Sequence, residues 1–114
     1  MPFIRATTNV KIEKNNEIAI KEDFGKAISL VSGKAECYLM IELSGERFMA
    51  YQGDEKTPLA MVEVQLLGES DSDELNLLTA AISESLNARL GIPKDRIYVN
   101  HSFYEYWGVG GHNC

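Results

Sequence analysis

The two halves of this 114-residue chain carry the same signals in the same order, and this repetition limits the fold more than any other feature. Each half has a proline near the start of a strand-forming run, then a stretch of helical periodicity, then a glycine where the helix should end. Pro2 and Pro58 are 56 positions apart and Gly33 and Gly91 are 58 apart, whereas half the chain is 57 residues. This spacing indicates an internal duplication of one strand–helix–strand unit.

The first half predicts a strand, a helix and a second strand. Residues 1–10 are rich in β-branched and aromatic residues, so we expect a strand that begins at the N-terminus. The apolar side chains between Ile20 and Val31 recur with a 3.6-residue period and predict an amphipathic helix. A mostly buried strand is expected over 38–43, and a short strand over 47–51 that would pair with it as a hairpin.

The second half predicts the same three elements again. The apolar run 58–67 reads as a strand, and residues 75–90 carry the apolar stripe of a second helix. Asp71 and Glu74 have the spacing of a capping box at the start of that helix. An alternating segment at 97–103 predicts the last strand.

Two units of this kind predict an α+β fold. A crossover through a helix makes the two strands of each unit parallel, with the helix over one face of the sheet. We therefore expect one domain over 1–114, with pseudo-repeats at about 1–57 and 58–114. Its two β-α-β repeats should form a four-stranded mixed sheet with two helices on one face, plus short extra strands. The strands at 38–43 and 58–67 are apolar on both faces, so the face without helices should be covered by other copies of the chain.

Composition excludes several classes of function. The net charge of −6 argues against binding to nucleic acid, which needs clustered Lys and Arg residues. The chain has no 18-residue apolar run and no recognisable export signal, so we expect no membrane association and a cytoplasmic location, with export by another route as the alternative. Cys37 and Cys114 lack metal or redox spacing, so we expect free thiols, with a disulfide between them as the alternative. His101 and His112 have no second ligand at a useful spacing in the sequence. We expect no metal and no cofactor.

Pro2 is the residue with the least usual chemistry. If Met1 is removed, Pro2 becomes a secondary amine held at the end of a strand, where a chain terminus normally frays. The simpler interpretation is an unremarkable proline after the start codon.

Several motifs together resemble the macrophage migration inhibitory factor family of the tautomerase superfamily. The resemblance covers residues 1 to about 108 and implies a homotrimer whose sheets enclose a central barrel, with active sites at the subunit interfaces. The motifs are Met1-Pro2-Phe3-Ile4 with Thr8-Asn9-Val10, Gly33-Lys34 with Tyr38, Leu67-Gly68, and the segment from Ile92 to Asn100.

The resemblance implies that Pro2, freed of Met1, is the catalytic base in keto–enol tautomerisation of aromatic α-keto acids such as phenylpyruvate, with dopachrome as a second candidate substrate. Lys34 would bind the substrate carboxylate and lower the pKa of the proline amine. This fits general chemistry, because a base that takes a proton from a carbon beside a carbonyl works best with a pKa near the operating pH. Without the resemblance, Lys34 would be a solvated lysine past a helix end.

Four further positions are implied to bind substrate. The resemblance places Asn100 as hydrogen-bond donor to the enol oxygen and Tyr98 in the pocket wall, both from the neighbouring subunit. Leu67 would offer backbone groups, and Tyr38 would line the pocket. The alternatives are a plain core position for Leu67, a core aromatic for Tyr38, and ordinary strand alternation for Tyr98 and Asn100.

The chain departs from the family pattern at its end. Val109 and Cys114 stand where pocket-rim aromatics are common in the family, and Trp107 is a candidate replacement. Leu59 and Val62 stand at the CxxC positions that some members use for thiol oxidoreduction, so we expect that activity to be absent.

Two other functions fit the resemblance. One is a secreted, cytokine-like signalling protein that binds a receptor and keeps a vestigial tautomerase site. The other is a proline-dependent dehalogenase or decarboxylase, which relies on additional arginines around the site. The four arginines of this chain show no pattern that supports the second alternative.

Overall fold

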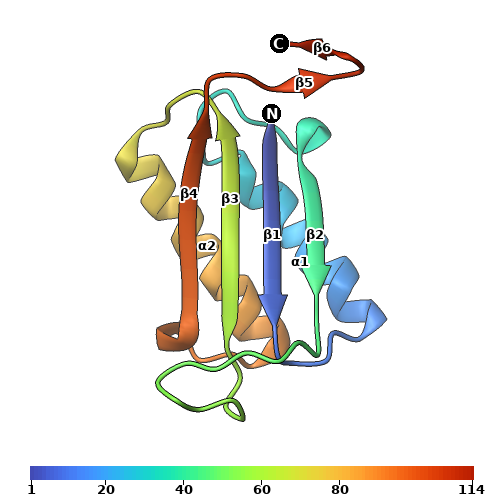
Figure 1. Ribbon diagram of the computed structural model, residues 1–114, viewed down its shortest axis with the longest axis vertical. Helices are drawn as coiled ribbons and strands as arrows, with labels where there is room; N and C mark the ends of the chain where they lie inside the picture. The colour runs from blue at the N-terminus through green and yellow to red at the C-terminus, as the bar shows by residue number, and fades with distance from the viewer.

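The computed structural model describes residues 1–114, which form one sheet, two long helices and a small C-terminal hairpin (Figure 1). In chain order the elements are β1 (Pro2–Thr8), α1 (Lys14–Ile28), a 3-10 turn (Glu36–Tyr38), β2 (Met40–Ser44), β3 (Ala60–Leu67), α2 (Ser72–Leu90), a 3-10 turn (Lys94–Arg96), β4 (Ile97–Tyr104), β5 (Gly108–Val109) and β6 (His112–Asn113).

The main sheet has the mixed topology that the duplication predicts. Its strand order is β2-β1-β3-β4, with β1 parallel to β2, β3 parallel to β4, and β1 antiparallel to β3 where the two units meet. Both helices cover the same face of the sheet (Figure 1). The predicted α+β fold of two β-α-β repeats is therefore confirmed.

The core lies between the sheet and the helices. In β1 and β3 every second residue is buried, which is the pattern of strands with one covered face. Each leucine, isoleucine or phenylalanine buried there contributes about 1.5–3 kcal/mol. The largest of these side chains are Ile4, Val62, Val64 and Leu66 from the strands, and Ile20, Phe24, Ile28, Leu78, Ile82 and Leu86 from the helices.

Only half of the predicted capping box forms at the start of α2. The Asp71 carboxylate accepts hydrogen bonds from the backbone N–H groups of Asp73 and Glu74, at 3.1 Å each. The Glu74 side chain accepts instead from the backbone N–H and the hydroxyl of Ser32, at 3.0 and 2.6 Å. It therefore ties the start of α2 to the turn after α1.

The predicted hairpin strand at 47–51 is absent. Gly45 lies so close to Val10 that any Cβ would come within 2.8 Å of the Val10 carbonyl oxygen, and Glu46 follows with a positive φ of 56°. The backbone N–H groups of Glu46 and Arg47 then bond to the carbonyls of Val10 and Thr8, so the chain follows the end of β1 and does not fold back on β2. The short extra strands are β5 and β6.

The face of the sheet without helices is less apolar than the sequence predicts. Its centre carries Arg5, whose guanidinium lies 2.8 Å from the Glu42 carboxylate and 3.5 Å from that of Glu63. Exposed aromatic and sulfur-containing side chains stand toward its ends, among them Met40 and Tyr98. This open face is thus a polar centre flanked by apolar ends. Neither helix is long and apolar enough to cross a membrane.

Candidate active site

Pro2 lies in a cavity of about 600 Å³ at the end of the sheet where β1 begins. The pairing of Pro2 with Leu66 in β3 fixes the start of β1, so the proline is buried and does not fray. The C-terminal hairpin of β5 and β6 lies beyond the same end of the sheet (Figure 1). The cavity is lined by Met1, Pro2, Phe3, Cys37, Tyr38, Met40, Gln65, Trp107, Gly108, Val109 and Gly110.

Lys34 and Leu67 are linked to the start of β1, although neither is among the residues that line the cavity. The Lys34 ammonium donates a hydrogen bond of 2.8 Å to the backbone carbonyl of Leu67. The backbone N–H of Leu67 donates to the carbonyl of Met1 at 3.2 Å. One residue at the end of β3 therefore links the cation of Lys34 to the peptide bond that precedes Pro2.

The electrostatic environment favours a neutral amine at the start of the chain. Burial lowers the pKa of the Met1 amine below its ordinary value, and the positive charge of Lys34 lowers it further, against a smaller opposing effect of Cys114. Burial removes water that would stabilise the charged amine, and the Lys34 cation repels a second positive charge nearby.

The C-terminal residues form one wall of the cavity. Trp107 and Val109 both line it, and the backbone N–H of Cys114 closes the hairpin with a 2.8 Å bond to the carbonyl of Trp107. The Trp107 ring meets Tyr104 edge-on, with centroids 6.0 Å apart. Trp107 therefore supplies an aromatic surface although Val109 stands where an aromatic is common.

Tyr98 and Asn100 do not lie in this cavity. Pro2 is level with Phe103 across the sheet, whereas Tyr98 is at the opposite end of β4, roughly 16 Å along the strand. Tyr98 and Asn100 alternate with the half-buried Val99 and are exposed on the open face. Within one protomer, the structure thus brings together Pro2, Lys34, Leu67 and Tyr38 and leaves the other two predicted site residues apart.

Four lining residues were missed by the sequence reasoning: Phe3, Cys37, Met40 and Gln65. Phe3 and Gln65 are direct partners across β1 and β3, and Phe3 also pairs with Met40 in β2. Once the register is known, these positions follow from strand alternation around Pro2. Cys37 could have been found as the direct neighbour of Tyr38.

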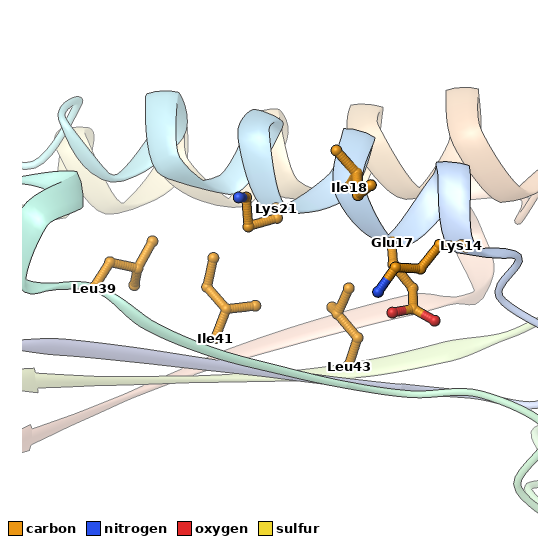
Figure 2. A pocket seen from close by; sticks show the side chains of 7 residues that line it. All are labelled: Lys14, Glu17, Ile18, Lys21, Leu39, Ile41 and Leu43. Carbon is orange, nitrogen blue, oxygen red and sulfur yellow. The ribbon is translucent and has the colours of Figure 1, made fainter.

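A second cavity of about 470 Å³ separates α1 from β2 and lacks comparable chemistry. Figure 2 shows the aliphatic side chains of Leu39, Ile41 and Leu43 pointing toward α1, with Lys21 and Ile18 opposite them. These walls combine aliphatic surface with the side chains of Lys14, Glu17 and Lys21, and none of the predicted site residues lines them. The candidate active site is the cavity at Pro2.

Comparisons with known proteins give one consistent result. The family model described as macrophage migration inhibitory factor matches residues 1–113. A macrophage migration inhibitory factor homologue of Trichuris trichiura is 27% identical over 100 residues, which are 88% of this chain and 86% of that protein.

Solved structures agree with this result. The crystal structure of MIF2 from Leishmania major has a TM-score of 0.93 at 26% identity, covering 100% of this chain and 97% of the other. A homologue from Prochlorococcus marinus has a TM-score of 0.86 at 26% identity, with 97% of each chain covered.

Proposed function

The chain belongs to the macrophage migration inhibitory factor family, and from that premise we propose that it is a keto–enol tautomerase for aromatic α-keto acids such as phenylpyruvate. The observation that carries the proposal is the arrangement around Leu67. Its backbone N–H holds the Met1 carbonyl at 3.2 Å, and its carbonyl holds the Lys34 ammonium at 2.8 Å.

Removal of Met1 would free two groups in one place. The Pro2 nitrogen would change from an amide, which cannot act as a base, to a secondary amine. The Leu67 N–H would lose its partner and become a free donor beside the Lys34 cation. A base would then lie in a largely apolar cavity, with a neutral donor and a cation next to the start of the chain, which suits an aromatic acid with a carboxylate at one end.

The proposed reaction needs little beyond these groups. The Pro2 amine accepts a proton from the carbon next to the ketone, and the electrons of that C–H bond form the enolate. A hydrogen-bond donor at the ketone oxygen stabilises the developing negative charge. That oxygen then takes a proton from water to give the enol, and the amine releases its proton to water, which regenerates the base. In the reverse direction the protonated amine returns its proton to carbon. Burial and the nearby Lys34 charge lower the pKa of the Met1 amine, and we propose that they act in the same direction on the Pro2 amine once Met1 is removed.

We assign the oxygen-binding donor to Asn100 of a neighbouring subunit. Asn100 and Tyr98 stand on the open face at a distance from their own Pro2, so they serve a Pro2 site only if a second copy brings them to it. This is the homotrimer with interfacial sites that the family resemblance implies. Tyr38 and Leu67 would complete the pocket from the subunit that carries Pro2.

The remaining assignments follow from the sequence. We propose a cytoplasmic protein whose partners are its own copies and a small α-keto acid. A receptor-binding, cytokine-like role is the alternative. The two roles differ in what they require, because turnover depends on the free Pro2 amine, whereas receptor binding does not have to depend on it.

The test is turnover of enol phenylpyruvate by protein whose intact mass shows that Met1 has been removed. We expect Pro2→Gly to lose most of the rate, because glycine offers a more mobile and differently placed primary amine. Protein that retains Met1 is the matched control and should also be slow, because its Pro2 nitrogen is an amide. A Pro2→Gly variant as fast as the wild type would refute the assignment of the base.

A further inference from the structure

The segment 51–58, which leads into β3, is held by one buried arginine. The Arg96 side chain is only 10% exposed, and its guanidinium is surrounded by backbone carbonyls of this segment. It donates to the carbonyls of Pro58 at 3.1 Å, Tyr51 at 3.4 Å, Asp54 at 3.1 Å and Thr57 at 3.2 Å. The guanidinium group is planar and rigid, so its hydrogen bonds to four carbonyl oxygens fix the path of the backbone through segment 51–58.

Asp54 fixes the same segment from inside. Its carboxylate accepts from the backbone N–H groups of Lys56 at 2.8 Å and Thr57 at 3.1 Å, and from the Thr57 hydroxyl. These bonds lower the pKa of Asp54 to about 2. Asn9 adds bonds to the carbonyls of Glu55 and Thr57. Connecting segments are usually more mobile than the elements they join, whereas this one is fixed by side-chain hydrogen bonds along its length.

The side chain that it holds is Tyr51. The Tyr51 ring meets the Tyr98 ring edge-on, with centroids 5.1 Å apart and planes at 71°. The Arg96 guanidinium carbon lies over the same ring, 5.4 Å from the Tyr51 centroid. Tyr51 therefore contacts both Arg96 and Tyr98. All three residues line a cavity of about 260 Å³ at the end of the sheet far from Pro2.

The contact with Tyr98 is unlike a core contact. Tyr98 is 55% exposed on the open face, so the pair gains less from burial than two core rings would. The Tyr51 hydroxyl, by hydrogen bonding, is the main cause that raises the pKa of Tyr98, with burial second. The Tyr98 ring is therefore held in a defined orientation by Tyr51 while it stays exposed on the open face.

We infer that Tyr51 is a further residue of the ligand site, where it orients Tyr98, and that Arg96 positions both through segment 51–58. The inference rests on the proposed function, in which Tyr98 reaches the Pro2 cavity of a neighbouring subunit. Tyr51 then enters that site beside Tyr98. A substrate would contact a pair of tyrosines whose geometry is fixed by the hydrogen bonds from Arg96 to four backbone carbonyls.

Kinetics of a double-mutant cycle test this inference. Tyr51→Phe keeps the ring and removes the hydroxyl, so we expect KM for phenylpyruvate to rise roughly three- to tenfold with kcat little changed. In a Tyr98→Phe background the same substitution should have no further effect. Arg96→Lys should raise KM similarly because an ammonium cannot replace the fork, whereas Arg89→Lys, in an ion pair between the helices, should leave KM unchanged.

A titration gives a readout independent of turnover. The tyrosinate absorbance of Tyr98 is obtained by subtracting the absorbance titration of the Tyr98→Phe variant from that of the otherwise identical chain. Its apparent pKa should fall toward the ordinary tyrosine value when Tyr51 is replaced by Phe. An unchanged Tyr98 pKa, or Tyr51→Phe and Tyr98→Phe effects on KM that simply multiply, would overturn the inference and leave the tautomerase intact. An inactive wild-type protein lacking Met1 would instead refute the proposed function, and the ligand-site role of Tyr51 with it.

Discussion

Lys34 has a fixed hydrogen-bond partner and an electrostatic effect on the start of the chain. Its ammonium is held 2.8 Å from the Leu67 carbonyl, and its charge contributes to the lowered pKa of the amine at the start of the chain. A solvated lysine after a helix would have neither a fixed partner nor an effect on that amine. The proposed reaction therefore gives Lys34 two separable roles, one in binding the substrate carboxylate and one in lowering the pKa of the base.

Replacing Lys34 by Ala separates the two roles. We expect KM to rise roughly tenfold or more, since a charge-assisted hydrogen bond to the carboxylate is lost. The nearby cation lowers the amine pKa, so its removal raises that pKa and the base protonates at higher pH. The acidic limb of the kcat/KM profile should therefore move to higher pH. Lys26→Ala, in the last turn of α1, is the control and should change neither quantity. If Lys34→Ala also leaves both unchanged, Lys34 has no part in the site.

The residues of the site divide by how they could be predicted. Pro2, Lys34, Leu67 and Tyr38 could be identified from motifs, and they meet at one end of the sheet. Gln65 could not, because no motif marks a residue whose role depends on strand register. Tyr51 was missed for a further reason: the sequence predicts it at the end of a strand, whereas it begins a segment organised by the distant Arg96.

At the scale of elements, the start of α2 is a junction as well as a helix end. The Asp71 carboxylate caps the helix through the N–H groups of Asp73 and Glu74. Asp71→Ala should lower the free energy of unfolding by about 1 kcal/mol, measured by urea denaturation. Asp73→Ala, which changes only a first-turn charge, should cost less. Equal losses in the two variants would mean that the helix dipole matters here and the cap does not.

The elements themselves followed from periodicity, and the connections did not. Both helices and the four main strands lie where the apolar pattern predicts them, because each pattern reflects one covered face. The prediction of a hairpin strand at 47–51 was wrong because the path of the chain there depends on Gly45 packing against Val10. This contact joins segments that are distant in sequence. The Glu74 half of the capping box failed for the same kind of reason, since Ser32 offers it a better partner.

At the scale of the whole molecule, the open face determines how the chain can assemble. Its centre carries Arg5 between Glu42 and Glu63, so it suits a wet, polar interior better than a dry sheet-to-sheet contact. The apolar groups at its ends, with the protruding Phe48, are better placed to meet other copies. This distribution fits a ring of subunits around a polar centre, which is the proposed homotrimer, and sedimentation at micromolar concentration should report three chains.

Mixing two defective variants tests the shared site directly. Pro2→Gly lacks the base and Asn100→Ala lacks the proposed donor, so each should be nearly inactive alone. When the two are unfolded together and refolded as one mixture, a site that pairs Pro2 of one subunit with Asn100 of its neighbour becomes complete. Random assembly of equal amounts should restore about one quarter of the sites. Each variant refolded alone is the control and should stay inactive. If the mixture of trimers stays as inactive as its components, Pro2 and Asn100 do not act in one interfacial site.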